Sequence, residues 1–445
     1  MTSSDAKPGM RLAIPVFHPA APGQVLLRTG YELESRSIAR LRDLGVRTLW
    51  IDIPELAFLS RHVSHEVVSR RADVAARVGE LFDGARQSVH AQIDYASYAE
   101  SIVPLIDALV EEPDAAIWVD RIARTGDAEL EHASTVSFLS TLIGLKLLWY
   151  LEHQRSRIPP SRAREVVPLG VAGMLHDVGY VRMSDEARAS ARDRPLPENP
   201  DFREHVEQGY KLISGRVPAT VAAAVLNHHQ HFDGTGFPHR TTADGRTEAV
   251  SGEQIHVHAR IVGVADAFDR LTTRGDEANE ANGPTETNEP AEANGGDDAD
   301  RPRVRVLNEM IRGELSSRFD PTVLHALLAV CPPYPPGSQL TLSTGQRCVA
   351  IGWDARHPCR PRVRPFDPDD PAAVAQAPTI DLREKPGVCV AEVDGHDVGR
   401  DNFYPESEAE FCLDARARQL HNAAESGRLR GADDMHAADE TRRSA

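Results

Sequence analysis

GMLHDVGY, from Gly173 to Tyr180, decides the fold of this chain because it ends an apolar run on a histidine–aspartate pair. Ionisable side chains on an apolar helix face are costly to bury unless they are paired or bound to a cation. The same apolar-flanked setting recurs at His132, His205, His228, His229 and Asp266. A single such histidine is more often a hydrogen-bonded core residue, but so many together predict a buried metal centre.

The residue types at this centre indicate which ions it binds. Imidazole and carboxylate ligands without a neighbouring cysteine favour Fe or Mn, with Zn or Ni as alternatives, and disfavour a thiolate zinc site. Asp177, beside His176, has two carboxylate oxygens and can bridge two cations. Two metals about 3.5–4 Å apart can hold a hydroxide and clamp a phosphoryl group for in-line attack. We therefore expect two divalent transition-metal ions, with Asp177 as a catalytic residue.

Motifs in a fixed order resemble those of the HD-GYP family within the HD phosphohydrolase superfamily. HDVGY at 176–180 resembles the family's HD signature, and HHQHFDGTGFP at 228–238 resembles its HHExxDGxGYP signature. Three further segments match the remaining parts of the pattern: HASTVSFLSTLIGLKLL from His132, EHVEQGYKLI at 204–213 and ARIVGVADAFDRLTTR at 259–274.

The resemblance implies a phosphodiesterase that hydrolyses a cyclic dinucleotide such as cyclic di-GMP in bacterial second-messenger signalling. It implies that one metal is bound by His132, His176, Asp177 and Asp266. Asp177 would bridge to a second metal, completed by His205, His228 and His229. Asp269 would orient a ligand by hydrogen bonding.

The chain also departs from the family pattern. Tyr180 stands where the family usually has Lys after HD-x-G, and a neutral Tyr can only donate a hydrogen bond to a phosphate. We expect Tyr180 to contribute to catalysis and the missing Lys to slow the reaction. Some family members hold a third metal with a Glu four residues before the first His. That position is Ala128 here, and we expect neighbouring Glu129 to be a surface charge.

Candidate substrate-binding residues follow from the same comparison. The loop after His229 supplies Gly236 and Phe237. Basic residues near the end of the Asp266 helix are candidates for phosphate contacts. These are Arg274, Arg301 and, with the same reasoning, Arg303.

Other functions fit parts of the pattern. A catalytically weak or degenerate HD-GYP protein could bind a nucleotide or a protein partner without turnover, and the missing Lys favours it. A phosphohydrolase of another nucleotide would use the same metal ligands. A non-haem iron oxygenase needs β-rich surroundings for its ligands, whereas these ligands lie in helical patterns.

We expect a mainly α protein whose all-helical HD-type domain lies between a small mixed α/β N-terminal module and a small β-rich C-terminal module. The N-terminal module covers 1–112 and the catalytic domain 113–333, with a disordered acidic insert at 275–300. Period-two patterning predicts the β-rich module at 334–404. A charged, partly disordered tail follows at 405–445.

Charge and composition indicate which partners and which cellular location to expect. The net charge is −17, of which nine negative charges fall in the insert, leaving −8 for the rest. Neither this balance nor the motifs indicate DNA or RNA binding. The sequence contains no long uninterrupted apolar run and no secretion signal at its start, so we expect a cytoplasmic protein without a membrane span. A homodimer or a signalling-protein partner is possible. The five cysteines show no paired spacing and are expected to be reduced thiols.

Overall fold

The structure, a computed structural model, describes residues 6–18, 21–46, 49–62, 64–87, 93–115, 128–193, 198–273, 301–367 and 377–422, with the single positions 3, 195 and 374. The acidic insert expected at 275–300 and the candidate Arg274 lie outside these residues.

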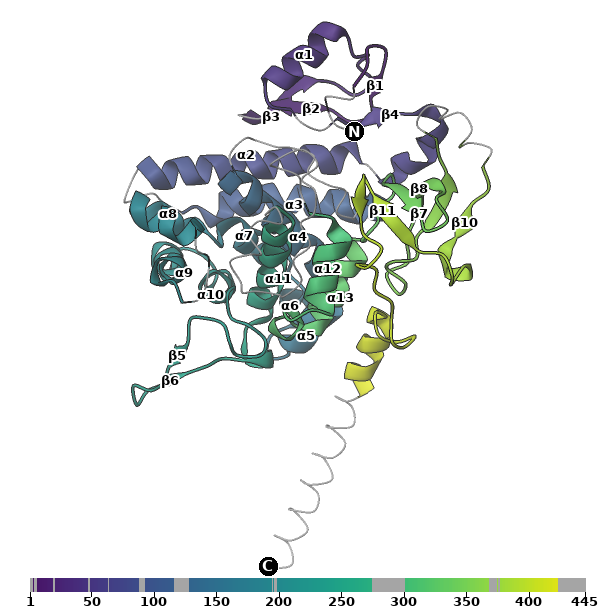
Figure 1. The fold of residues 1–445 in the computed structure, drawn as a ribbon. Helices are drawn as coiled ribbons and strands as arrows, with labels where there is room; N and C mark the ends of the chain where they lie inside the picture. Colours follow the sequence, from purple (N-terminus) through teal and green to yellow (C-terminus); the bar gives the residue numbers. More distant parts are fainter. Residues whose placement is uncertain are drawn as a thin grey trace, which may run out of the picture.

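Helices make up the centre of the molecule, and most of them share one apolar core (Figure 1). They are α2 (His65–Gln87), α3 (Tyr95–Glu111), α4 (Ala128–Lys146), α5 (Leu148–Gln154), α6 (Pro160–Ala163), α7 (Val167–Leu175), α8 (Asp185–Asp193), α9 (Pro200–Ile213), α10 (Ala219–Asn227), α11 (Val257–Thr273), α12 (Arg303–Ile311) and α13 (Pro321–Val330). α4 is buried on nearly all sides from Ala133 to Gly144, as expected for a helix that is apolar all round. It packs against α7, α11 and α13 and is the axis of the bundle.

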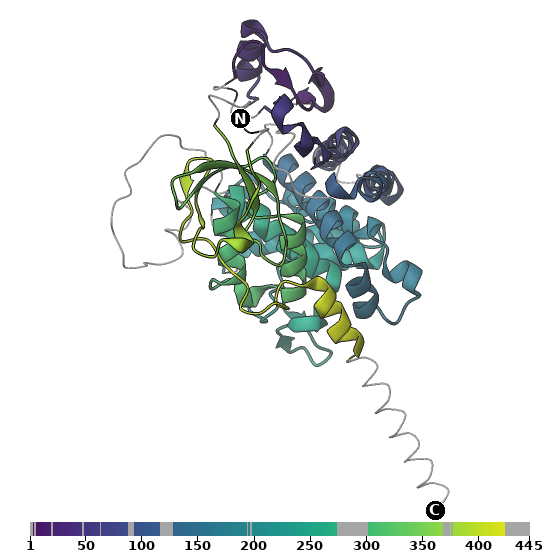
Figure 2. The ribbon, with the colours of Figure 1, turned by 90° about the vertical axis from the view of Figure 1, so that its right-hand side faces the viewer.

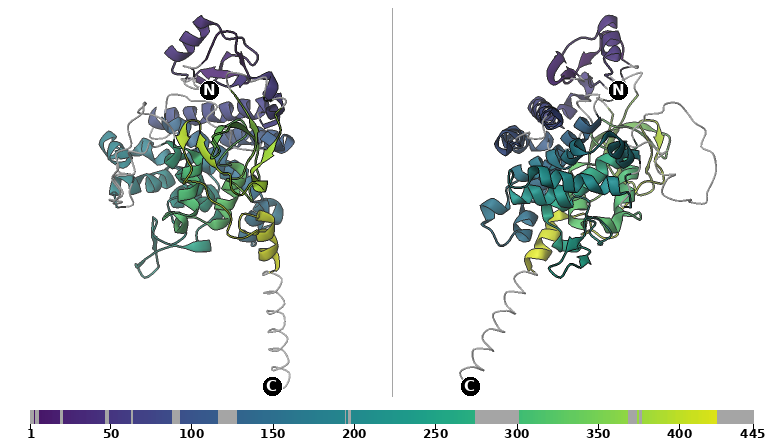
Figure 3. Two further views of the ribbon diagram at one scale, coloured as in Figure 1. Left: turned by 45° about the vertical axis from the view of Figure 1, so that its right-hand side comes forward. Right: turned by 90° about the vertical axis from the view of Figure 1, so that its left-hand side faces the viewer.

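The N-terminal module is smaller than the expected 1–112. Its own core joins Leu12, Leu33, Ile38 and Leu49 in a lobe at one end of the molecule (Figures 1 and 3). The elements of this lobe are β1 (Arg11–Leu12), β2 (Val16–His18), β3 (Ala21–Leu27), α1 (Ser35–Asp43) and β4 (Ile51–Asp52).

Helices α2 and α3, which we had assigned to the N-terminal module, belong to the helical core instead. Val78 of α2 and Ile102 of α3 are fully buried in the same cluster as α4 and α7. The helical core therefore includes helices that precede the predicted boundary at 112. The highly charged exposed face of α2 resembles that of a separate accessory helix, and the sequence does not show what its apolar face packs on.

A sheet follows the helices, as the period-two pattern predicted, and the mainly α fold with a β-rich C-terminal region is confirmed. Within the described residues its antiparallel order is β10-β9-β8-β7-β11-β12. The strands are β7 (Gln339–Leu342), β8 (Arg347–Gly352), β9 (Arg362–Pro365), β10 (Ile380–Asp381), β11 (Val390–Val393) and β12 (His396–Asp397). A separate hairpin, β5 (Arg240–Thr241) with β6 (Thr247–Glu248), projects between α10 and α11.

The two faces of the sheet pack on different partners. Leu340, Leu342 and Cys348 belong to the large helical core, and Figure 2 shows the sheet lying against the helices. Val349 and Ile351, which alternate with that face, pack instead near the 3₁₀ helix Pro54–His62. One face of the β-rich segment is therefore part of the helical core, while the other has a small apolar cluster of its own.

The tail begins later than the expected residue 405. Phe411 is 2% exposed and lies in the large core, where its ring meets His325 of α13 and Phe403 edge-on. Residues 413–422 are helical. A single buried aromatic in a charged stretch has no periodicity to reveal it, which is why the sequence did not predict this contact.

Two further expectations can be checked. All five cysteines are free. Among the described residues no single helix is long and apolar enough to cross a membrane, and only the pair α4 and α5, bent by 83°, meets the criteria of length and composition when taken together.

Gly179 lies where the chain after α7 crosses α9. A Cβ at this position would lie 1.8 Å from the carbonyl oxygen of His205 and 2.7 Å from the backbone nitrogen of Gly209. Only a residue without a side chain allows this approach, which brings the His176–Asp177 pair beside α9.

Gly179→Ala should therefore destabilise the protein by about 1–3 kcal/mol or more, because the backbone of α9 must move. Gly84→Ala is the matched control. Gly84 is an exposed position of α2, a Cβ there would meet no atom of the described residues within 4 Å, and alanine should stabilise the protein by about 0.5–1 kcal/mol. Chemical denaturation of both variants measures the difference. Equal stabilities would contradict the close approach.

Candidate metal centre

The seven predicted ligands converge from five helices. His132 lies in the first turns of α4, Asp266 in α11 and His205 in α9, while His176 caps α7 and His228 caps α10. Their ligand atoms form two groups in which all atoms lie within 4.8 Å of one another. The groups are Asp177, His205, His228 and His229, and His132, His176 and Asp266. The residues of the sequence motifs therefore meet in space.

Asp177 stands between the two groups. Its Oδ1 lies 3.4 Å from Nε2 of His205 and 3.8 Å from Nε2 of His228. Its Oδ2 faces the other group, 3.4 Å from Nε2 of His176 and 3.7 Å from Nε2 of His132. Each oxygen thus serves one group, which is the geometry that a bridging carboxylate requires.

Local hydrogen bonds orient the imidazole rings. The Nδ1 of His176, His205 and His228 lies within hydrogen-bond distance of the carbonyl oxygen three residues earlier, at 2.8, 2.5 and 2.9 Å. A ring that donates its Nδ1 proton in this way presents Nε2 to the centre, which is the tautomer that a metal ligand needs.

His132 is oriented differently, by a side chain. Its Nδ1 lies 2.7 Å from Oδ2 of Asp269, which is buried in α11 one turn after Asp266. This contact is the one expected of Asp269 as a residue that orients a ligand. Pairing with a carboxylate also makes the imidazole a stronger electron donor.

Two buried polar atoms fit a bound cation. Oδ1 of Asp177 and Nε2 of His229 are buried and have no hydrogen-bond partner among the residues that the structure describes. Leaving such a group unpaired in the interior costs about 1–3 kcal/mol, and more for a charged group. Both belong to the same group of ligands, so a divalent cation held there would compensate both.

Burial and neighbouring charges shift the pKa values of the histidines in opposite directions. Burial lowers the pKa of His205 to about 4 and that of His228 to about 3, so both rings are neutral near pH 7. Burial opposes protonation of His176 as well, but the carboxylates of Asp177 and Asp266 outweigh it and raise the pKa of that ring to about 10. A cation bound by Nε2 of His176 would replace this proton, because a ligating imidazole must be neutral.

Arg270 is a member of the centre that the sequence analysis missed. Its Nη2 donates to Oδ2 of Asp177 at 2.5 Å and its Nε donates to Oδ1 of Asp266 at 2.6 Å. Burial opposes the charge of the guanidinium, but both carboxylates raise the pKa of Arg270. The available signal was the spacing, because Arg270 lies four residues after Asp266 on one helix and therefore on the same face.

Tyr180 is part of the wall of the centre. Its ring stacks on His205, with centroids 4.5 Å apart and planes 10° from parallel, and it is 7% exposed. It also lies near enough to Arg270 to contribute to the raised pKa of that guanidinium. The packing of Tyr180 therefore holds the ring of a predicted metal ligand, His205, in place. The catalytic contribution expected from the sequence stays a prediction.

The candidate substrate residues Gly236 and Phe237 also support the centre. Phe237 is 3% exposed and packs against His229 and Phe202, with ring centroids at 5.0 and 5.6 Å. A Cβ at Gly236 would lie 2.2 Å from the carbonyl oxygen of His229. Since Phe237 is buried, it presents little surface to a substrate, and packing behind His229 is its evident role.

Arg301 was expected to contact a phosphate, but its side chain pairs with a carboxylate of the protein. Its side chain is 6% exposed and forms a double hydrogen bond to the Glu309 carboxylate in α12, while its backbone nitrogen donates to the carbonyl oxygen of Thr272. Arg301 thus joins α12 to the end of α11, and its guanidinium is already neutralised by Glu309. The pattern of basic residues could not show that an acid on the next helix pairs with it.

Glu129 pairs with a residue of α2, a helix that carries none of the predicted ligands. Its Oε2 accepts a hydrogen bond from Arg86 of α2 at 2.7 Å, and Ala128 offers no ligand atom. Glu129 is in neither of the two groups of ligand atoms found among the described residues, and the expectation of two metals rather than three stays a prediction.

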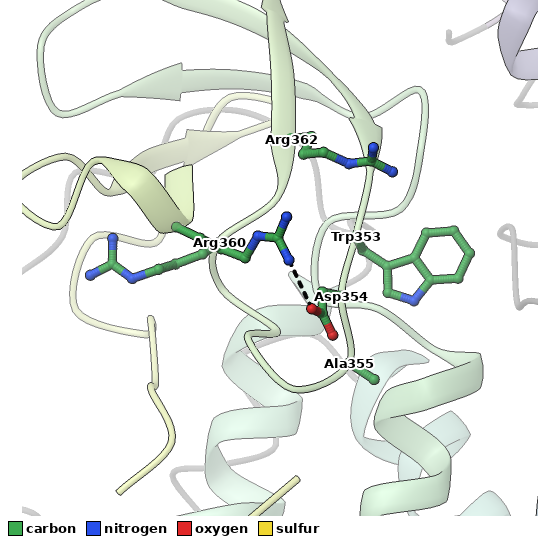
Figure 4. A pocket seen from close by; sticks show the side chains of 6 residues that line it. Trp353, Asp354, Ala355, Arg360 and Arg362 are labelled. Atoms are coloured by element: carbon green, nitrogen blue, oxygen red, sulfur yellow. Dashed lines mark hydrogen bonds and ion pairs between the residues drawn. The ribbon is translucent and has the colours of Figure 1, made fainter. Parts of the chain in front are cut away.

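A cavity of about 470 Å³ lies in the β-rich segment, away from the predicted ligands. It is lined by Trp353, Asp354, Ala355, Arg360, Arg362 and Arg383 (Figure 4). Arg383 pairs with Asp354 and Asp381, and Arg360 donates to backbone carbonyls of the Leu382–Val388 segment. These two guanidinium groups therefore hold loops of the sheet together.

Comparison with known proteins agrees with the motifs. Residues 157–287 match the HD domain family, which confirms the HD domain predicted from the sequence. The chain is 25% identical to the cyclic di-GMP phosphodiesterase PA4108 of Pseudomonas aeruginosa over 372 residues, which is 76% of this chain and 78% of that protein.

Two shorter similarities to phosphodiesterases accompany this match. The chain is 34% identical over 110 residues to the cyclic di-GMP phosphodiesterase response regulator RpfG of Xanthomonas campestris, covering 24% of this chain and 27% of that one. It is 29% identical over 103 residues to the 3'3'-cGAMP-specific phosphodiesterase 2 of Vibrio cholerae, covering 22% and 18%. The solved structure of Bd1817, a HDG"Y"P protein from Bdellovibrio bacteriovorus, has a TM-score of 0.37 and 14% identity, covering 74% of this chain and 98% of that one.

The buried histidines predict how stability depends on pH. Burial lowers the pKa of His205, His256 and His231 to about 4, from an ordinary value of 6.5. The unfolded chain therefore takes up protons that the folded chain excludes, and the free energy of unfolding should fall as the pH drops from 6.5 towards 4. His176, with its raised pKa, is protonated in both states there and adds nothing to this loss.

Chemical denaturation with a chelator present, at steps between pH 7 and pH 4, measures this fall. His256→Asn, outside the ligand groups, should make it shallower, whereas the same change at exposed His396 should not. A flat profile would contradict the assignment of buried neutral rings.

Proposed function

We propose that this chain is a metal-dependent phosphohydrolase of the HD domain family and that it hydrolyses a phosphodiester bond of cyclic di-GMP. The family match and the names of the relatives support the reaction class and the cyclic dinucleotide substrate. The observation that carries the proposal is the position of Asp177, whose two oxygens face two separate groups of ligand atoms.

In this proposal the two groups hold two divalent ions, Fe or Mn in preference to Zn or Ni. When bound, such ions activate a water for attack and neutralise charge on the phosphoryl group. The protein's part is to orient the ligands, to supply neutral imidazoles and to keep the centre enclosed. His205 and His228 are neutral near pH 7 because burial lowers their pKa, so they are ready to bind without losing a proton.

Tyr180 and Phe237 contribute to the reaction by holding metal ligands in place. Tyr180 stacked on His205 and Phe237 packed on His229 restrict two rings that would bind the same ion. A misplacement of about 1 Å at a catalytic centre can cost about a hundredfold in rate, which is why such packing matters.

Asp177→Asn should remove the bridging charge while preserving shape. We expect loss of bound metal and a fall in cyclic di-GMP hydrolysis of at least about a hundredfold, since even partners behind metal ligands are worth about 10–100-fold. Asp185→Asn is the control, because Asp185 is highly exposed at the start of α8. The measurement is separation of products after incubation with Mn²⁺ or Fe²⁺, and near-normal turnover in Asp177→Asn would refute the bridging role.

The metal content of the protein is a second test. Elemental analysis of protein saturated with Mn²⁺ and then desalted should approach two ions per chain. Glu129→Ala should leave that ratio unchanged, because Glu129 is engaged by Arg86 and Ala128 cannot ligate. A ratio near three that falls on Glu129→Ala would make Glu129 a ligand.

A second candidate is a catalytically weak HD-GYP protein that binds the nucleotide as a signal. The observation that favours it is Tyr180 in place of the family's Lys, since the ring is committed to packing on His205. Equilibrium binding of cyclic di-GMP with two metals bound but no product formed would make this the better account.

A further inference from the structure

Arg270 contacts the same oxygens that a metal at the His132, His176 and Asp266 group would need. Its guanidinium binds Oδ2 of Asp177 and Oδ1 of Asp266, and that oxygen of Asp266 also lies 2.9 Å from Nε2 of His132. One cationic side chain therefore bridges the two carboxylates on the side of His132 and His176.

Arg270 contacts only one of the two oxygens of Asp177, so it affects the two groups of ligand atoms differently. Arg270 binds Oδ2 of Asp177, whereas Oδ1, which faces His205 and His228, is buried and accepts no hydrogen bond from the described part of the chain. Nε2 of His229 on that side is likewise without a partner there. The guanidinium neutralises one side of the centre and leaves the ligand atoms on the other side available to a cation.

A guanidinium and a divalent cation on the same carboxylate oxygens repel each other strongly in a buried site, where charges are poorly screened. Arg270 can avoid this by moving, because it is on the last turns of α11 and its side chain is 23% exposed, whereas that of Asp266 is only 4% exposed. A flexible arginine at the edge of the centre can swing outward while the buried carboxylate cannot.

We propose that Arg270 is an internal cation of the metal centre, which competes with the ion of the His132, His176 and Asp266 group and makes the two ions bind in order. The ion held by Asp177, His205, His228 and His229 binds first. The second ion binds more weakly because it must displace the guanidinium of Arg270 from both carboxylates. This inference rests on the two-metal site of the proposed function but on no particular substrate.

The test is calorimetric titration of chelator-treated protein with Mn²⁺, which needs no substrate and no turnover. The wild type should bind in two separate steps, the second the weaker. Arg270→Gln should tighten the second step by about tenfold or more and leave the first nearly unchanged. Arg270→Lys, which keeps the charge but not the two-pronged geometry, should give an intermediate affinity.

Thermal denaturation separates competition from a merely structural role. Arg270→Gln should lower the melting temperature of the chelator-treated protein, because two buried carboxylates lose their partner, and this loss should largely vanish when Mn²⁺ is saturating. A structural residue would destabilise both forms alike. Arg305→Gln is the control, because Arg305 is comparably buried and pairs with Asp401 outside the centre.

The outcomes are distinct. Two equal steps in the wild type, or a second step weakened by Arg270→Gln, would overturn the proposal. Tighter binding of the second ion in Arg270→Gln would support it even if neither protein hydrolysed cyclic di-GMP, in which case only the proposed function would fail. Binding of one ion to the wild type and two to Arg270→Gln would also support the competition, while contradicting the two-ion content proposed for the wild type.

Discussion

The buried carboxylate of Asp177 is the constraint on which the rest of the structure depends. A negative charge in a protein interior is stable only when partners compensate for the lost water, and the partners here come from α4, α7, α9, α10 and α11. Those helices must converge for the charge to be tolerated, and the large apolar core makes them converge. Core and centre are therefore two aspects of one packing arrangement, in which glycines such as Gly179 let the helices approach.

Much of the fold could be predicted because its patterns are local. The β-rich segment was predicted from period-two alternation of apolar residues, and β7 and β8 form an antiparallel pair within it. The wrong predictions concern contacts between segments that are distant in the sequence. The affiliation of α2 and the burial of Phe411 depend on surfaces distant in the sequence, and no periodicity encodes them.

The same distinction applies to the centre. Its seven ligand residues were predicted by motif, and the structure brings them into two groups. Arg270 was missed and Arg301 was assigned to the wrong partner, since the sequence shows that a residue is basic but not which carboxylate it meets. Tyr180 was considered for a catalytic contribution and for the charge it lacks, whereas its stacking on His205 needed three-dimensional information.

The hydrogen bonds from His176, His205 and His228 to carbonyls three residues earlier have a consequence for evolution and design. Each ring is oriented by a hydrogen bond within its own helical turn. The residues that fix the orientation are therefore four consecutive ones. Such fragments can be moved between helical scaffolds without redesigning the surroundings, whereas His132 must travel together with Asp269 from another helix. Insertions within these turns would rotate a ring away from the centre, while the loops that join the helices are free to vary in length.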